Sequence, residues 1–250
     1  MNPLDNRSEK DLLNRLATNY SVNSPYSTIK KSIIFDEIAK FVTCAKEKTV
    51  LQLGLASGQE TTLLADTFAH VDVVDGSSKF IDMATAKNSY DNVKYIYSLF
   101  EEYETERKYD YIYSTYVFEH VLSPEVILKK LKAYLSTDGL IFITVPNANS
   151  FSRHLAKEIG LVSDLYALTE NDLSVGHRRV YDSKELERTV ISAGYEIVAI
   201  RGIIFKILAD FQLNRLLSEK IISEKLIWGL QKMGDKNVDY CDSVLCVARA

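Results

Sequence analysis

Short apolar runs alternate with longer amphipathic stretches in the part of the chain that ends at Pro146. The apolar runs predict five strands, over residues 49–53, 71–75, 93–97, 111–114 and 140–145. The last of them is almost continuously apolar, which is typical of a strand in the middle of a parallel sheet. Between the strands the pattern predicts helices. One of these opens at Ser123-Pro124, carries Val126, Ile127, Leu131 and Leu135, and ends at Thr137-Asp-Gly139.

The two ends of the chain depart from this alternation. Residues 8–20 and 27–46 are predicted to be helical, and in the second of these segments Ile34, Ile38 and Val42 repeat every fourth residue. Near the C-terminus we predict a helix over 182–193, a strand over 195–201, a helical excursion over 203–233 and a final strand over 243–248. A strand, an excursion and a terminal strand favour an antiparallel pair at the sheet edge. The whole order predicts a doubly wound α/β fold with right-handed crossovers.

Composition narrows the class of protein. At 250 residues the chain can form one large α/β domain, and its 46% hydrophobic and 26% charged residues are those of an ordinary soluble globule. A net charge of -4 gives no electrostatic reason to expect a nucleic-acid partner. The polar N-terminus and the lack of a long apolar run predict a cytoplasmic protein without a transmembrane segment. Cys44, Cys241 and Cys246 are interpreted as buried thiols of a reducing compartment.

The first predicted strand leads into a glycine-bearing turn, and the second ends in a carboxylate. The turn is Val50-Leu-Gln-Leu-Gly-Leu-Ala-Ser-Gly58, and Asp75 follows Gly54 by about 20 residues. In Rossmann-like sheets this arrangement holds a nucleoside, with the acid on the ribose hydroxyls. A helix-capping or turn-forming acid is the structural alternative for Asp75. The turn lacks both the third glycine of a dinucleotide site and the lysine of a phosphate-binding loop.

Five successive segments resemble the class I S-adenosylmethionine-dependent methyltransferases. They are the glycine turn, Asp75, the pair Leu99-Phe100, the segment Ser114-Thr-Tyr-Val-Phe-Glu-His-Val121, and Val145-Pro-Asn147. The fourth is similar to the Glu-His-Val signature of small-molecule methyltransferases related to those of quinone biosynthesis. The resemblance implies a Rossmann-like seven-stranded, mostly parallel sheet with helices on both faces and a C-terminal antiparallel strand. It also implies S-adenosylmethionine as the cofactor and S-adenosylhomocysteine as the product.

The resemblance also implies a set of cofactor contacts. They are Gln52, Gly54, Ala56, Gly58, Asp75, Gly76, Ser77, Leu99, Phe100, Ser114 and Thr115. Two positions depart from the family pattern, because Gln52 stands where Asp or Glu is usual and Ala56 replaces the middle glycine. Gln52 can accept a hydrogen bond from the loop or, through water, from the cofactor's ammonium group, but it brings no charge.

Two histidines are candidates for the catalytic base. His120 follows the fourth strand at the carboxyl edge of the sheet, and His177 lies in the segment Gly176-His-Arg-Arg-Val-Tyr-Asp182. Each has a structural alternative: His120 as a packed residue that supports the cofactor loop, and His177 as a loop anchor. Predicted substrate contacts are Tyr20, Tyr26, Glu119, Arg178, Arg179 and Tyr181. The arginines can pair with a phosphate or carboxylate, or one of them can cap a helix. Because no other carboxylates cluster with Glu119, we expect no metal.

Together these features predict one methyltransferase domain over residues 1–250. Residues 1–47 form a helical lid, 48–146 bind the cofactor, and 147–181 and 203–238 are acceptor-binding or cap insertions. The helical excursion caps the acceptor pocket or forms a homodimer face. The expected acceptor is a small molecule: a hydroxyl of a sugar, a nucleotide-linked sugar or a phosphorylated metabolite in surface-polysaccharide or natural-product biosynthesis. The alternatives are N-methylation of an amino sugar and binding of the cofactor without catalysis.

Overall fold

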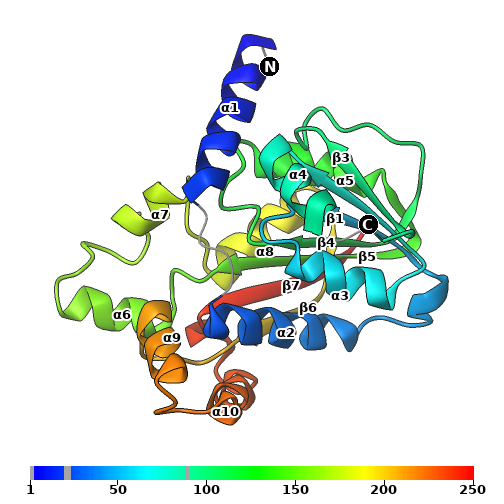
Figure 1. Ribbon diagram of the computed structural model, residues 1–250. Coiled ribbons are helices and arrows are strands. Elements are labelled where there is room, and N and C mark those ends of the chain that lie inside the picture. Colours follow the sequence, from blue (N-terminus) through cyan, green and yellow to red (C-terminus); the bar gives the residue numbers. More distant parts are fainter. Residues whose placement is uncertain (1–2, 20–23, 88–89) are drawn as a thin grey trace.

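A seven-stranded sheet forms the centre of the protein in a computed structural model that describes residues 3–19, 24–87 and 90–250 (Figure 1). The strand order is β3-β2-β1-β4-β5-β7-β6. β7 pairs antiparallel with both β5 and β6, whereas the other pairs are parallel. The bounds are β1 Thr49–Leu53, β2 His70–Asp75, β3 Val93–Tyr97, β4 Tyr109–Thr115, β5 Leu135–Pro146, β6 Glu196–Ile203 and β7 Ser243–Arg249. The predicted Rossmann-like, mostly parallel sheet with an antiparallel C-terminal strand is confirmed.

Helices cover both faces of this sheet. On one face α5 and α8 pack through Ile127, Leu131 and Leu186, and on the other face α2 and α3 pack through residues such as Ile34 and Leu64. The longer helices are α1 Pro3–Asn19, α2 Pro25–Ala39, α3 Gln59–Thr67, α4 Ser78–Lys87, α5 Pro124–Lys132, α8 Ser183–Ser192, α9 Asp210–Ser218 and α10 Glu224–Gly234. Shorter ones are α6 Phe151–Glu158 and α7 Glu170–Ser174, with single 3₁₀ turns at Ala45–Glu47 and Val238–Tyr240.

Alternation along β5 explains how one strand serves both cores. Ile141 and Ile143 belong to the core under α5 and α8, whereas Phe142 between them belongs to the core under α2. All three side chains are at most 1% exposed. A strand buried on both faces has no polar side, which accounts for the continuous apolar run in the sequence.

Two predicted helix boundaries are wrong. The helix expected through Leu135 ends at Lys132, and residues 137–139 lie inside β5. There, β5 pairs through Leu135 with Tyr109 and resumes at Leu140, so the turn-forming residues are accommodated at a register shift. The helix expected over 27–46 ends at Ala39, although Val42 still packs against the same core.

The excursion expected over 203–233 is two helices rather than one. α9 ends just before Lys220, whose positive φ of 58° breaks the helix, and α10 begins at Glu224. Of the three thiols, Cys241 and Cys246 are buried as predicted, but Cys44 is exposed. Within the described residues, no helix combines the length and the apolar content that crossing a bilayer requires.

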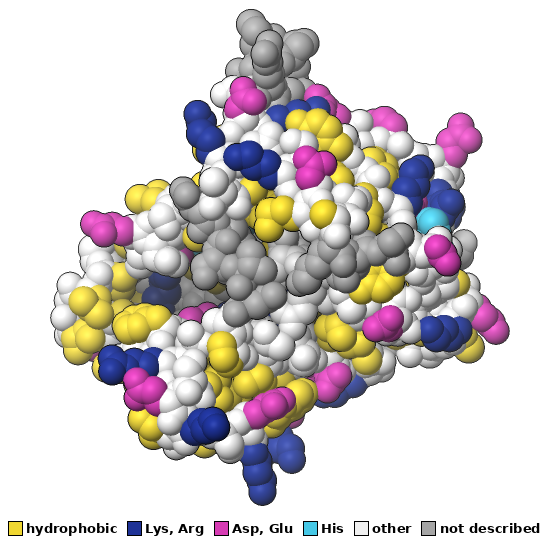
Figure 2. Space-filling model, in the orientation of Figure 1, with side chains coloured by type: hydrophobic (Ala, Val, Ile, Leu, Met, Phe, Trp, Pro, Cys, Tyr) yellow, Lys and Arg dark blue, Asp and Glu magenta, His cyan; other side chains and the backbone are white. Residues whose placement is uncertain are grey.

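Exposed apolar side chains are frequent on the helices that lie outside the sheet layers. Ile159 and Leu161 follow α6, Phe211 lies on α9, and Ile221 lies between α9 and α10; each is more than 60% exposed. Figure 2 shows apolar side chains on the lower left of the molecule, where Figure 1 places α6, α9 and α10. A patch of this kind is typical of a surface that meets a ligand or another protein.

Candidate active site

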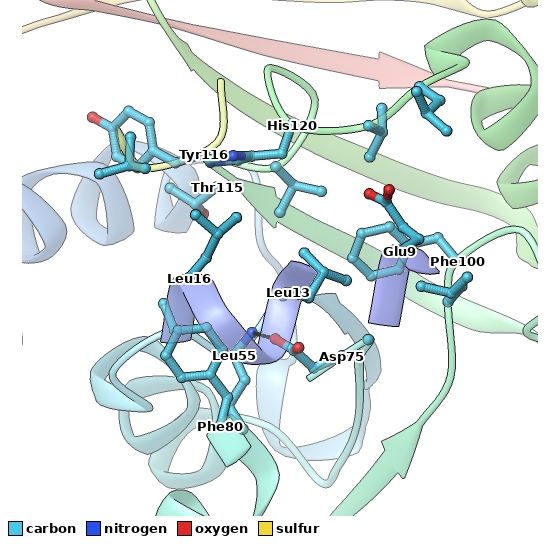
Figure 3. A pocket seen from close by; sticks show the side chains of 18 of the residues that line it. Glu9, Leu13, Leu16, Leu55, Asp75, Phe80, Phe100, Thr115, Tyr116 and His120 are labelled. Atoms are coloured by element: carbon cyan, nitrogen blue, oxygen red, sulfur yellow. Dashed lines mark hydrogen bonds between the residues drawn. The ribbon is translucent and has the colours of Figure 1, made fainter. Parts of the chain in front are cut away.

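A cavity opens at the carboxyl ends of β1, β2 and β4 (Figure 3). Between β1 and β4 the strand order reverses, and in open α/β sheets ligands bind outside such a switch point. The empty space is about 930 Å³, its opening to solvent included. It is lined by Glu9, Leu13, Leu16, Gly54, Leu55, Ala56, Glu60, Asp75, Gly76, Phe80, Leu99, Phe100, Glu101, Thr115, Tyr116, Val117, His120, Val121, Leu122 and Val175. This volume and its mostly apolar lining suit a small organic ligand.

The glycine turn forms the floor of the cavity next to β1. Gly54 and Gly58 have φ angles of 76° and 72°, a left-handed conformation that side chains disfavour. A Cβ on Gly54 would also come within 2.9 Å of Val117 Cγ2. Ala56 has a φ of 44° in the same turn and keeps its methyl group. The turn is therefore held in its shape at a cost in backbone strain at Ala56.

Gln52 holds this turn from below. Its Nε2 atom donates to the Gly54 carbonyl at 2.9 Å, and its Oε1 atom accepts from Thr61 Oγ1 at 2.8 Å. The side chain is 1% exposed and does not line the cavity. Both ends of its amide are thus bonded within the protein, and the position of Gln52 does not support the predicted direct contact with the cofactor.

Asp75 connects the end of β2 to the glycine turn. Its carboxylate accepts from the backbone N–H of Leu55 and from that of Ser77, each at 2.7 Å, and the first bond is drawn in Figure 3. Burial raises the pKa of Asp75 to about 6, against the lowering effect of these two N–H groups. The carboxylate lines the cavity together with Gly76, Leu99 and Phe100. Asp75 therefore orders the turn and also faces the ligand space.

Helix α1 closes the cavity from the outside, as Figure 3 shows for Leu13 and Leu16. Asn14 of the same helix accepts from Ser77 Oγ at 2.9 Å. These cavity-facing side chains lie on one stripe of the helix, because four residues separate Glu9 from Leu13 and three separate Leu13 from Leu16. The sequence offered this signal, but within the predicted lid of residues 1–47 only Tyr20 and Tyr26 were selected as ligand contacts. Tyr20 lies outside the described residues.

Tyr26 and Tyr181 do not line the cavity. Tyr26, on α2, is completely buried, with the ammonium groups of Lys30 and Lys206 each 5.5 Å from its ring centroid. Tyr181 is 2% exposed and belongs to the core under α5 and α8. Gly58, Ser77 and Ser114 also stay outside the lining, whereas the other predicted cofactor contacts in the turn and along β2 to β4 are part of it.

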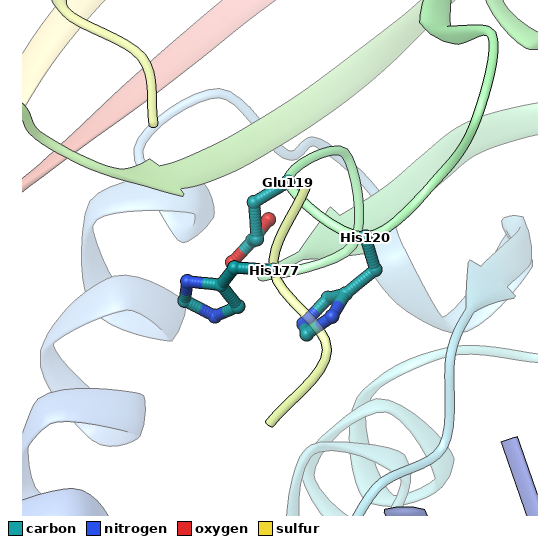
Figure 4. A group of neighbouring side chains, drawn as sticks. All are labelled: Glu119, His120 and His177. Carbon is teal, nitrogen blue, oxygen red and sulfur yellow. The ribbon is translucent and has the colours of Figure 1, made fainter. Parts of the chain in front are cut away.

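Glu119, His120 and His177 come together beside the loop that follows β4 (Figure 4). The Glu119 side chain is completely buried and neither oxygen has a hydrogen-bond partner. Burial raises the pKa of Glu119 to about 7, in spite of the nearby His177. Burial and the charge of His177 lower the pKa of His120 to about 4. One ligand atom from each residue lies within 4.8 Å of the others, so the three together have the composition of a metal site.

Asp172 orients His177. Asp172 Oδ1 lies 3.2 Å from His177 Nδ1, and the Thr169 hydroxyl and N–H donate to its second oxygen at 2.8 and 2.9 Å. Although burial opposes it, these hydrogen bonds hold the pKa of Asp172 well below its usual range. Asp172 was not among the predicted site residues. Its only sequence signal is the capping box that it forms with Thr169 at the start of α7.

The two arginines of this segment are engaged by the protein. Arg178 donates to both carboxylate oxygens of Glu9 at 2.7 and 2.9 Å and to the His120 carbonyl at 2.6 Å. Arg179 donates to the carbonyls of Phe118, Val121 and Leu122. Both guanidinium groups therefore hold the loop after β4, and neither lines the cavity.

Residues 27–200 match a family described as a methyltransferase domain. Two curated relatives illustrate the range of similar proteins. The malonyl-[acyl-carrier protein] O-methyltransferase of Priestia megaterium (strain DSM 319 / IMG 1521) is 31% identical over 166 residues, which are 62% of this chain and 61% of the relative. The (S)-coclaurine N-methyltransferase of Thalictrum flavum subsp. glaucum is 28% identical over 111 residues, which are 42% of this chain and 31% of the relative. The chain thus spans less than two thirds of both relatives.

The fold is also found among solved structures. The structure of an S-adenosylmethionine-dependent methyltransferase from Mesorhizobium loti superimposes with a TM-score of 0.61 at 14% sequence identity. The superposition covers 87% of this chain and 98% of that one. At this identity the likeness concerns the fold alone.

Proposed function

Because this chain belongs to the methyltransferase domain family, we propose that it transfers a methyl group from S-adenosylmethionine to an oxygen of a small polar acceptor. Asp75 would bind the ribose hydroxyls, Leu99 and Phe100 would flank the adenine, and the turn from Gly54 to Gly58 would receive the methionine part. The apolar walls of the cavity and the Thr115 hydroxyl, which forms no hydrogen bond of regular geometry, support this fit. The cofactor, when bound, supplies an activated methyl group on a sulfonium.

The protein's own contribution is alignment, exclusion of water and removal of a proton. Leu13 and Leu16 of α1 lie over the cavity and would keep water from the reacting atoms. An alcohol must lose its proton as the new bond forms, so methylation at oxygen calls for a base beside the acceptor. An amine that is already unprotonated needs no such group.

We assign the base to His177, and the observation that carries the assignment is its pairing with Asp172. When Nδ1 donates to a carboxylate, the imidazole is fixed in the tautomer whose Nε2 lone pair can accept a proton, and the imidazolium that forms is stabilised. His120 is the weaker base because its pKa is lowered to about 4. Its ring centroid lies 4.7 Å from that of His177 in an edge-on arrangement, which suits it to shape the acceptor pocket.

The acceptor class rests on the site's polarity. His120, which lines the cavity, and His177 beside it offer ring nitrogens to a hydroxyl-bearing molecule such as a sugar, a nucleotide-linked sugar or a phosphorylated metabolite, with the buried Glu119 behind them. Arg178 and Arg179 give less support to an anionic acceptor, because their side chains already bind Glu9 and backbone carbonyls. We further propose that residues 147–181 and 203–238 shape the acceptor pocket. The exposed apolar side chains of α9 and of the segment after it would then form an acceptor-facing or homodimer surface.

The test is a transfer assay with labelled cofactor against panels of sugars, nucleotide sugars, phosphorylated metabolites and amino sugars. The proposal expects product with a hydroxyl acceptor and loss of turnover in His177→Ala. Methylation of an amino sugar at undiminished rate in that variant would make the protein an N-methyltransferase. Cofactor binding without any transfer across the panels would favour a binding protein.

A further inference from the structure

The methionine end of the proposed cofactor carries two opposite charges, an α-ammonium and an α-carboxylate. Placing charges in a cavity that excludes water is costly unless the protein supplies partners for them. Gln52 supplies none, because its amide is neutral and both of its ends bind Gly54 and Thr61. Asp75 lies at the end of β2 and accepts from Leu55 and Ser77. A partner for the ammonium group must therefore come from another element.

Glu60 is a carboxylate at the required place. It is the second residue of α3, directly after the glycine turn, and it lines the cavity while being only 6% exposed. Its Oε1 atom accepts a long hydrogen bond from the Tyr113 hydroxyl at 3.4 Å. No Lys, Arg or His nitrogen of the described residues comes within 4.0 Å of it. Burial raises the pKa of Glu60, and the charge of Lys31 and the hydroxyls of Thr115 and Tyr113 offset this rise only in part.

The start of α3 gives Glu60 a favourable helix dipole, but that effect is small. It does not explain why the carboxylate faces a cavity instead of solvent. Thr115 lines the same cavity, and its buried hydroxyl is near enough to lower the pKa of Glu60 but forms no hydrogen bond of regular geometry. Two incompletely satisfied polar groups, on α3 and at the end of β4, thus border the ligand space.

A partly buried ammonium group lies beside the glycine turn, outside the residues that line the cavity. Lys31 of α2 donates to Ser57 Oγ of the glycine turn at 2.8 Å. Burial lowers the pKa of Lys31, an effect that Glu60 partly offsets, so the two charges sense each other. They nevertheless form no ion pair within 4.0 Å. A carboxylate and an ammonium held apart in this way match the two charges of a free amino acid group.

We propose that Glu60 binds the α-ammonium group of the cofactor's methionine and that Lys31, beside Ser57, binds its α-carboxylate. This inference rests on the proposed cofactor. The negative charge that an acid would bring at position 52 is then supplied by Glu60, in the first turn of α3. The nucleoside half of the ligand would be bound independently, by Asp75, Leu99 and Phe100.

Three ligands separate these contacts. S-adenosylmethionine carries both charges, decarboxylated S-adenosylmethionine keeps the ammonium only, and 5′-methylthioadenosine lacks the amino acid group. Dissociation constants are measured by calorimetry for the wild type, Glu60→Gln and Lys31→Met. Glu125→Gln is the matched control, because Glu125 is likewise the second residue of a helix, α5, carries the same charge and does not line the cavity. Thermal unfolding without ligand shows whether each variant is folded.

We expect Glu60→Gln to weaken binding of the first two ligands about 10- to 100-fold, the range for a charge-assisted hydrogen bond, and to leave 5′-methylthioadenosine unchanged. Lys31→Met should weaken S-adenosylmethionine alone, and Glu125→Gln should weaken none. Equal losses for all three ligands in folded Glu60→Gln, or no loss, would overturn the inference. If the wild type binds 5′-methylthioadenosine but the losses in Glu60→Gln and Lys31→Met do not differ among the three ligands, only this inference fails. If the wild type binds none of the three ligands, the proposed function fails as well.

Discussion

His177 Nδ1 lies 3.2 Å from a carboxylate oxygen of Asp172, five residues earlier in the chain. The short separation brings the acid from the start of α7 and the histidine from the loop after it into one unit, closed by the Thr169 capping box. The pair points His177 toward the buried Glu119 (Figure 4). A histidine that is oriented in this way is suited to accept a proton and to hold the resulting charge.

The first prediction concerns this pair. His177→Ala should lower kcat for a hydroxyl acceptor about 10²- to 10⁴-fold, the usual contribution of a general base. Asp172→Asn should lower it by at least about tenfold, because the amide cannot stabilise an imidazolium. Steady-state kinetics at saturating acceptor measures both. His154→Ala is the control, because this histidine of α6 contacts Asn149 and belongs neither to the cavity lining nor to the cluster of Glu119, His120 and His177. A loss in His120→Ala that exceeds the loss in His177→Ala would transfer the role of base to His120.

The second prediction is a pH dependence of cofactor binding. The pKa of Asp75 is raised to about 6 in the free protein. Ribose hydroxyls donate to the ionised carboxylate, so binding favours ionisation and lowers this pKa. Affinity should thus be constant well above pH 6 and fall about tenfold per pH unit well below it. Calorimetry with S-adenosylhomocysteine between pH 5 and 8 measures the profile. The pKa of Glu119 is raised to about 7, in the same range. The fall in affinity is therefore assigned to Asp75 only if Asp75→Asn binds the ligand weakly and with an affinity that does not change with pH.

Patterns that are local in sequence predicted most of the fold. The alternating burial of β5 and the turn between Gly54 and Gly58 follow from side-chain periodicity and from backbone freedom, which are properties of neighbouring residues. The division of residues 203–233 into two helices could not be predicted in this way, because Lys220 is an ordinary helix former that adopts a positive φ between α9 and α10. Leu135 likewise fits a helical pattern, but its pairing with Tyr109 places it in β5.

The candidate site was predicted less completely than the fold. Asp75 and His120 were predicted because they lie at or shortly after strand ends, which converge at one edge of a parallel sheet, and both line the cavity. Asp172, Glu60 and Lys31 lie on helices and act through contacts that periodicity does not encode. Arg178 looked like an anion ligand in the sequence because nothing there shows that both carboxylate oxygens of Glu9, on α1, accept from its Nη2 group.

The third prediction is a change in stability at the glycine turn. Ala56 has a φ of 44°, and a left-handed conformation costs a side chain about 1–2 kcal/mol. Ala56→Gly relieves this strain but gains chain entropy in the unfolded state, so we expect a net stabilisation of about 1 kcal/mol and a rise in Tm of about 2–4 °C. Gly58→Ala is the mirror experiment, because its Cβ would meet Ala84 at an ordinary 3.9 Å and only the φ of 72° opposes it. It should lower Tm by a similar amount. Equal Tm values for wild type and both variants would contradict the strain.

The fourth prediction concerns metal dependence. The cluster of Glu119, His120 and His177 has the composition of a transition-metal site. However, burial raises the pKa of Glu119 to about 7, and His177 is paired with Asp172. We expect turnover to be unchanged after dialysis against a chelator and metal analysis to find no stoichiometric ion. Loss of turnover that manganese, cobalt or zinc restores would instead make these three residues a metal centre, and His177 would then be a ligand rather than the base.

The last prediction separates two roles of Arg178. If it joins the loop after β4 to the lid, its partner Glu9 is equally necessary, and the two residues act as one unit. Glu9→Gln and Arg178→Gln should then each raise the dissociation constant of S-adenosylhomocysteine about two- to fivefold, as befits a partly exposed ion pair. The double variant should be no worse than the more severe single one, which is the signature of coupled residues. If Arg178 binds an anionic acceptor, Arg178→Gln will raise the acceptor's KM while Glu9→Gln leaves it unchanged. The same four proteins, assayed for cofactor binding and for acceptor KM, therefore decide between a lid contact and a substrate contact.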